Sequence, residues 1–80
     1  MITEDQLKNS GWAFREKCPF SGEPYWFKDE QYDEDFDRMS EIFMYYPNRS
    51  EVRYSSCQYS TITKPAKDIK YLNNFYEVLK

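Results

Sequence analysis

The stretch EIFMYYPNRSEVRY, residues 41–54, predicts a β-hairpin and with it the class of the fold. Residues 41–46 are mostly apolar and aromatic, as in a buried strand. The next four residues, PNRS at 47–50, have the composition of a short hairpin loop. A second strand then alternates, with Val52 and Tyr54 on one side and polar residues on the other. The centre of the chain therefore predicts two antiparallel strands.

Two further strands are predicted upstream of this hairpin. Residues 12–15 alternate Trp and Phe with Ala and Arg, so we expect Trp12 and Phe14 on one buried face. The stretch YWF at 25–27 predicts a strand that is aromatic on both faces. Between them, residues 18–24 contain two prolines around a Ser-Gly pair, which is typical of a turn. The acidic residues that follow are expected to interrupt the second strand.

The N-terminus has the signals of a short helix. Thr3 is suited to the N-cap, and Gln6 three residues later completes a capping box. Ile2 and Leu7 occupy the positions of a hydrophobic staple. Gly11 can adopt the left-handed conformation that ends a helix. These local signals predict a helix within the first eleven residues.

The C-terminus predicts a longer amphipathic helix. Pro65 suits the first turn of a helix, while residues 55–63 could extend the preceding strand or form a loop. An apolar stripe then recurs every three or four residues, at Ile69, Leu72, Phe75, Tyr76 and Leu79. The expected fold is a single α+β domain over residues 1–80. It has a short N-terminal helix, an antiparallel sheet of three to four strands, and the long C-terminal helix packed on one face.

The composition argues against an enzyme. The chain has no His, so the side chain best suited to proton transfer near neutral pH is missing. Its two glycines are not clustered, which excludes a phosphate-binding loop, and without His the two cysteines cannot form an ordinary zinc site. We expect a non-enzymatic protein without cofactor or metal.

The chain also lacks the patterns of membrane insertion and secretion. No stretch has the length and hydropathy of a membrane helix, and residues 1–7 lack a signal-peptide pattern, so we expect a cytoplasmic protein without membrane contact. In a reducing cytosol, Cys18 and Cys57 are expected to be thiols, although the sequence leaves a disulfide between them open.

The run KDEQYDEDFDRMSE, residues 28–41, carries seven carboxylates, and residues 29–41 within it, with one Arg, have a net charge of −6, against −3 for the whole chain. An EF-hand calcium loop that starts at Asp29 or at Asp33 is excluded, because neither start provides the Gly needed for the turn or the final bidentate Glu. The run is then either a solvated loop that guards the sheet edge, or a surface for a basic protein, acting as a nucleic-acid mimic. A helical turn would let Tyr32 and Phe36 anchor it to the core. The candidate partner-binding residues are Asp29, Glu30, Tyr32, Asp33, Glu34, Asp35, Phe36 and Asp37.

Two other functions stay open. Tyr and Arg residues between Arg49 and Lys64 could bind single-stranded nucleic acid, although the chain needs most of its sixteen aromatic residues for a core and its net charge opposes phosphate binding. The chain could also assemble with itself into a structural homo-oligomer.

The layout resembles that of small, uncharacterised accessory proteins of tailed phages and their bacterial hosts. The resemblance rests on the opening MITEDQLKNSGWAF, the YWF strand and the closing DIKYLNNFYEVLK, and it does not extend to the acidic run. It implies an accessory protein that binds and disables a host or defence protein in the host cytoplasm. We therefore expect a non-enzymatic protein-binding module that uses an acidic face against a basic partner.

Overall fold

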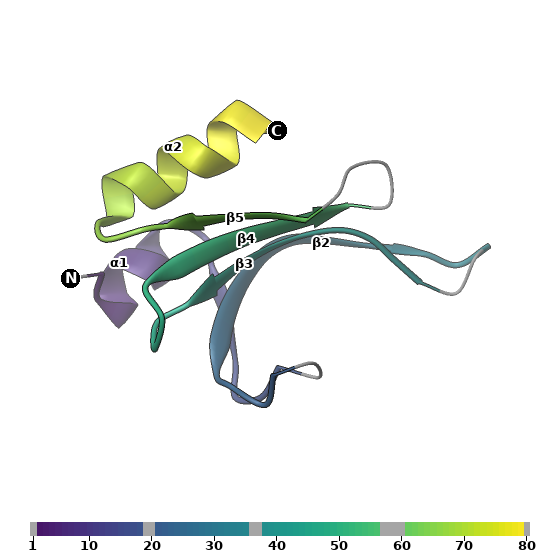
Figure 1. Cartoon of the computed structure of the whole chain (residues 1–80), viewed down its shortest axis with the longest axis horizontal. Coiled ribbons are helices and arrows are strands. Elements are labelled where there is room, and N and C mark those ends of the chain that lie inside the picture. Colours follow the sequence, from purple (N-terminus) through teal and green to yellow (C-terminus); the bar gives the residue numbers. More distant parts are fainter. Residues whose placement is uncertain (1, 19–20, 36–37, 57–60, 80) are drawn as a thin grey trace.

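The chain forms a five-stranded antiparallel sheet with both helices on one face (Figure 1). The computed structural model describes residues 2–18, 21–35, 38–56 and 61–79. The elements along the chain are α1 (Glu4–Asn9), β1 (Ala13–Arg15), β2 (Tyr25–Asp33), β3 (Arg38–Tyr46), β4 (Glu51–Ser56), β5 (Ile62–Pro65) and α2 (Ile69–Leu79). The predicted α+β class is confirmed, but the sheet has five strands instead of three to four.

The local signals predicted for α1 are all present. The Thr3 side chain accepts a hydrogen bond from the backbone N–H of Gln6 at 3.2 Å, and the Gln6 side chain accepts one from the backbone N–H of Thr3 at 2.9 Å. At the other end Gly11 has a φ of 89°, and the backbone N–H of Trp12 donates to the Leu7 carbonyl at 3.0 Å. This arrangement is a Schellman motif, which ends the helix and directs Trp12 back over it.

The sheet is a meander, because the strands lie side by side in the order of the chain. The central hairpin is confirmed: β3 and β4 pair from Tyr46 with Glu51 outward, and residues 47–50 form the turn. β2 is longer than predicted, since it continues through the acidic residues to Asp33 and pairs there with the start of β3 at Arg38. Ladder hydrogen bonds to β3 compensate for the low strand propensity of these acidic residues.

The region around Pro65 also differs from the prediction. Pro65 ends β5 and does not begin the C-terminal helix. β5 is an edge strand, and Pro is tolerated there because an outward-facing N–H has no partner in the sheet. The helix α2 begins at Ile69, after Asp68, whose carboxylate accepts a hydrogen bond from the backbone N–H of Tyr71 at 2.7 Å.

The sheet is buried on both faces along β3. Phe43 and Tyr45 point towards the helices, and Ile42, Met44 and Tyr46 point the other way. The helix-side cluster comprises Ile2, Leu7, Trp12, Trp26, Phe43, Tyr45, Val52, Tyr54, Ala66 and Leu72, with Ile62, Ile69, Phe75, Tyr76 and Leu79 packed against it. The predicted stripe of α2 and its packing on one sheet face are therefore confirmed.

One predicted core position is wrong. Trp12 is 3 % exposed, but Phe14 on the edge strand β1 is 48 % exposed, because a strand at the edge of the sheet lacks a neighbour on its outer side. Its ring still contacts that of Trp26, with 5.1 Å between the ring centroids. Neither α1 nor α2, the helices of the described residues, is long and apolar enough to cross a bilayer.

Candidate functional site: the β2–β3 arm

The acidic run forms the outer half of the β2–β3 hairpin. We define the arm as residues 29–35 and 38–41. In Figure 1 this hairpin extends away from both helices, beyond the part of the sheet that they cover. Most of the predicted partner-binding residues therefore lie on a projecting structure, and the way its base is held decides how they are presented.

A β-bulge marks the base of the arm. The register between β2 and β3 shifts between Lys28 and Gln31, and Asp29 has a φ of 53°. Asp is one of the few residues other than Gly that enter this left-handed region at tolerable cost. The bulge turns both Lys28 and Asp29 towards the helix side of the sheet, while Glu30 contacts Arg15 on the opposite side. Neighbouring acidic residues are thus fixed on different faces.

On the helix side, the bulge is attached to α2 and α1. The Tyr76 hydroxyl of α2 donates a short hydrogen bond to the Asp29 carboxylate. The Lys28 ammonium lies 4.2 Å from the centroid of the Tyr76 ring and donates to the Ser10 carbonyl, at the end of α1, at 2.6 Å. A carboxylate and an ammonium on adjacent residues therefore fasten the base of the arm to the same tyrosine.

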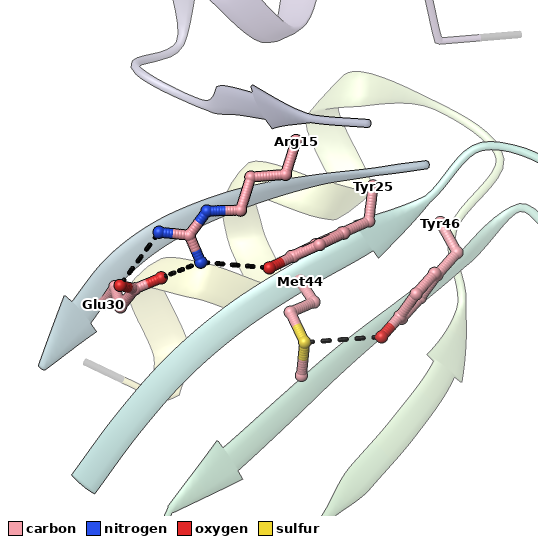
Figure 2. Close-up of polar contacts among 5 residues, drawn as sticks. All are labelled: Arg15, Tyr25, Glu30, Met44 and Tyr46. Carbon is pink, nitrogen blue, oxygen red and sulfur yellow. Dashed lines mark hydrogen bonds and ion pairs between the residues drawn. The ribbon is translucent and has the colours of Figure 1, made fainter. Parts of the chain in front are cut away.

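On the opposite face, Glu30 is held by Arg15 of β1 (Figure 2). The two guanidinium nitrogens lie 3.0 and 2.5 Å from the two carboxylate oxygens, and Arg15 also donates to the Tyr25 hydroxyl at 3.1 Å. Hydrogen bonds to Glu30 and then to Tyr25 raise the pKa of Arg15. The guanidinium carbon lies 4.0 Å from the centroid of the Phe27 ring, so Arg15 is fixed by stacking as well.

The remaining predicted residues lie further out. Tyr32 on β2 is 54 % exposed, and Glu34 and Asp35 are exposed in the turn. Asp33 ends β2, and Phe36 and Asp37 lie outside the described residues. Tyr32 is in a strand, so the helical turn suggested for the run does not form there, because pairing with β3 extends to the hairpin end.

The structure thus separates the eight predicted residues into groups with different roles. Asp29 and Glu30 bind Tyr76 and Arg15 at the base of the arm, and Tyr32, Glu34 and Asp35 are exposed further out. The sequence did not predict that Tyr76, Arg15 and Lys28 hold the base of the arm. Tyr76 matched the apolar stripe of the C-terminal helix, and nothing in the local pattern of Arg15 or Lys28 indicates a partner across the fold.

The residues of the nucleic-acid alternative are largely engaged within the fold. Within Arg49–Lys64, Tyr54 is 4 % exposed and Tyr59 lies outside the described residues, while the neighbouring Tyr45 and Tyr46 of β3 are 3 and 1 % exposed. The Tyr46 hydroxyl donates to the Met44 sulfur at 3.4 Å (Figure 2), and burial raises the pKa of Tyr46. Arg49 forms an ion pair with Glu23 at 2.8 Å. The described residues of β3, β4 and β5 therefore present no row of exposed aromatic rings on which bases could stack.

The described part of the chain contains no cluster of three or more His, Cys, Asp or Glu side chains suited to a metal ion. Cys18 is buried, and its sulfur lies 3.3 Å from the Tyr46 hydroxyl. Cys57 lies outside the described residues, so the structure does not test a disulfide between the two cysteines. Compared with known protein families, curated proteins and solved structures, the chain has no significant match.

Proposed function

We propose that this protein is a non-enzymatic binding module that engages a basic surface of a partner protein through the tip of the β2–β3 arm. The observation that carries the proposal is the bracing of the arm. Asp29 and Glu30 are fastened to Tyr76 and Arg15 on opposite faces of the sheet, and the exposed residues follow directly beyond them.

A braced arm favours binding because less conformational freedom is lost when the partner docks. Tyr32 supplies amphipathic contact area, since Tyr has only two side-chain torsions and is enriched at binding hot spots. Glu34 and Asp35 provide negative charge at the tip, which steers a positively charged surface towards the arm and aligns it. An inhibitor of a host or defence protein, including one whose basic groove normally binds nucleic acid, fits this combination.

Direct nucleic-acid binding is less well supported. The exposed charged side chains of the arm tip, Glu34 and Asp35, are acidic, which opposes approach to phosphates. The tyrosines of the central strands, which a stacking surface would need, are buried.

The test is capture of a partner from host lysate with the wild-type chain, with an arm variant and with a charge-matched control. The arm variant is Glu34→Gln with Asp35→Asn. The control is Glu4→Gln with Glu16→Gln, which removes two exposed carboxylates elsewhere. Exposed charge pairs contribute about 0.2–1 kcal/mol each, so the arm variant should bind roughly 2- to 30-fold more weakly and with less salt dependence.

A photo-reactive amino acid in place of Tyr32 locates the contact directly. We expect it to cross-link to the captured partner, and the same group in place of Thr63, an exposed residue of β5, should not. Equal loss of binding in the arm variant and the charge-matched control, or cross-linking from position 63 alone, would refute the proposal.

A further inference from the structure

A second surface lies on α2, on the side that faces neither the core nor the arm. A groove of about 400 Å³ runs between α2 and β5, and its walls include Ile62, Tyr71, Phe75 and Val78. Val78 is 82 % exposed and Tyr71 is 42 % exposed. The helix therefore has two apolar sides, one in the helix-side cluster and one in solvent.

The solvent-facing side has a regular arrangement. Tyr71, Asn74 and Val78 recur at intervals of three and four residues, which places them in one row along the helix. Lys70 and Glu77 are seven residues apart, both exposed, and lie together on one flank of that row. A row of this kind with charges on its flank is the pattern by which helices pair.

The two flanking charges do not stabilise α2 as an isolated helix. Lys70 lies in the first turn, where the helix dipole favours a negative group, and Glu77 lies in the last turn, where it favours a positive one. Each charge is therefore placed against the dipole. This placement is explained if each charge meets the opposite charge on another molecule.

We propose that this side of α2 binds a second copy of the same chain, with the two helices antiparallel about a two-fold axis. An axis between Asn74 and Phe75 brings Tyr71 of one copy beside Val78 of the other, and does so twice. The same axis places Lys70 within about two residues, or roughly 3 Å of helical rise, of Glu77 of the second copy. The flank therefore complements itself in charge, whereas a uniformly basic or acidic partner would oppose one of its two charges.

The sheet edge beside the groove does not provide the contact. β5 has only four residues and ends in Pro65, which has no N–H to donate to a new strand. Association therefore depends on side chains of an 11-residue helix and the adjoining groove. An interface of this size falls at or below roughly 1,200 Å² of total buried area, so the dimer should form reversibly at micromolar or higher concentration. This inference is independent of the proposed function, because the arm lies outside the contact.

The test is sedimentation equilibrium of the full chain from micromolar to near-millimolar concentration. We expect a monomer–dimer equilibrium for the wild type. Val78→Asp should associate at least tenfold more weakly and so remain monomeric over this range. Lys70→Glu and Glu77→Lys should each weaken association several-fold, because each brings like charges together. The double variant Lys70→Glu with Glu77→Lys should restore it, because the charges are exchanged.

Thermal unfolding at a concentration where the chain is monomeric separates loss of contact from loss of fold. Each single charge reversal agrees better with the helix dipole, so the monomer should melt at the same or a higher temperature while the dimer weakens. The arm variant Glu34→Gln with Asp35→Asn serves as a control and should dimerise as the wild type does. A wild type that stays monomeric throughout, or a double variant that associates no better than the single variants, overturns the inference.

Discussion

Replacing Tyr76 with Phe tests how firmly the base of the arm is held. The substitution removes the hydroxyl that donates to Asp29 but keeps the ring, whose centroid lies 4.8 Å from that of Phe43 and 4.2 Å from the Lys28 ammonium. A hydrogen bond to a charged group contributes about 1.5–3 kcal/mol, and the half-buried position favours the lower value. We expect Tyr76→Phe to lower the free energy of unfolding by about 1.5 kcal/mol, or the Tm by about 6–12 °C.

Substitutions at Asp29 separate the hydrogen bond from the backbone conformation. Asp29→Ala loses the hydrogen bond and keeps a left-handed φ, whereas Asp29→Gly loses the bond but relieves the strain. The Gly variant should therefore be more stable than the Ala variant by about 1 kcal/mol. In the double variant Tyr76→Phe with Asp29→Gly, the loss should equal that of Asp29→Gly alone within about 0.5 kcal/mol.

The assay is urea unfolding followed by circular dichroism, with Tyr71→Phe as the control. Tyr71 is on the same helix but 42 % exposed, so its loss should stay below about 0.5 kcal/mol. Additive losses at Tyr76 and Asp29, or equal stabilities of the Ala and Gly variants, would show that the bulge is not held in the way described.

Two further predictions concern the cores on the two faces of the sheet. Leu72 is 0 % exposed, so Leu72→Ala should lower the free energy of unfolding, measured in urea, by about 2–5 kcal/mol. Val78→Ala, at an 82 % exposed site on the same helix, should lower it by less than about 0.5 kcal/mol. Similar losses for the two variants would contradict the docking of α2 on the sheet. Burial raises the pKa of both Tyr45 and Tyr46 above the ordinary value of 10.0. The stability that each buried neutral tyrosine contributes is fully present below about pH 10 and is lost as the pH rises above it. Above about pH 10 the free energy of unfolding should therefore fall by up to about 1.4 kcal/mol per pH unit for each tyrosine. A free energy of unfolding that stays constant from about pH 9 to 11 would contradict this prediction.

The elements that the sequence predicted well are those whose signals are local. The capping box at Thr3 and Gln6, and the left-handed Gly11, determine α1 through contacts within a few residues. The central hairpin follows from a turn between two strongly patterned strands. In each case the physical cause lies within about ten residues of its effect, so it can be read without knowledge of the fold.

The predictions that failed depend on contacts with other elements of the fold. β2 continues through Asp33 because β3 pairs with it, and Pro65 lies in a strand because β4 is beside it. The same holds for the site. The run was recognisably acidic, but Asp29 is bound by a hydroxyl 47 residues away and Glu30 by a guanidinium 15 residues away. The charge pattern alone could not distinguish the acidic residues that hold the base of the arm from those that are exposed at its tip.

The meander order of the strands bears on how the chain reaches this structure. Every strand pairs with its neighbour in sequence, so the sheet can grow one hairpin at a time without closing a long loop. Pairing of this kind keeps the sheet contacts closer in sequence than crossover connections would, which favours faster folding at a given stability. The central hairpin of β3 and β4, with its short turn and buried residues on both faces, is the natural starting point for folding. The docking of α2, which needs several strands in place to cover its apolar stripe, then completes the process.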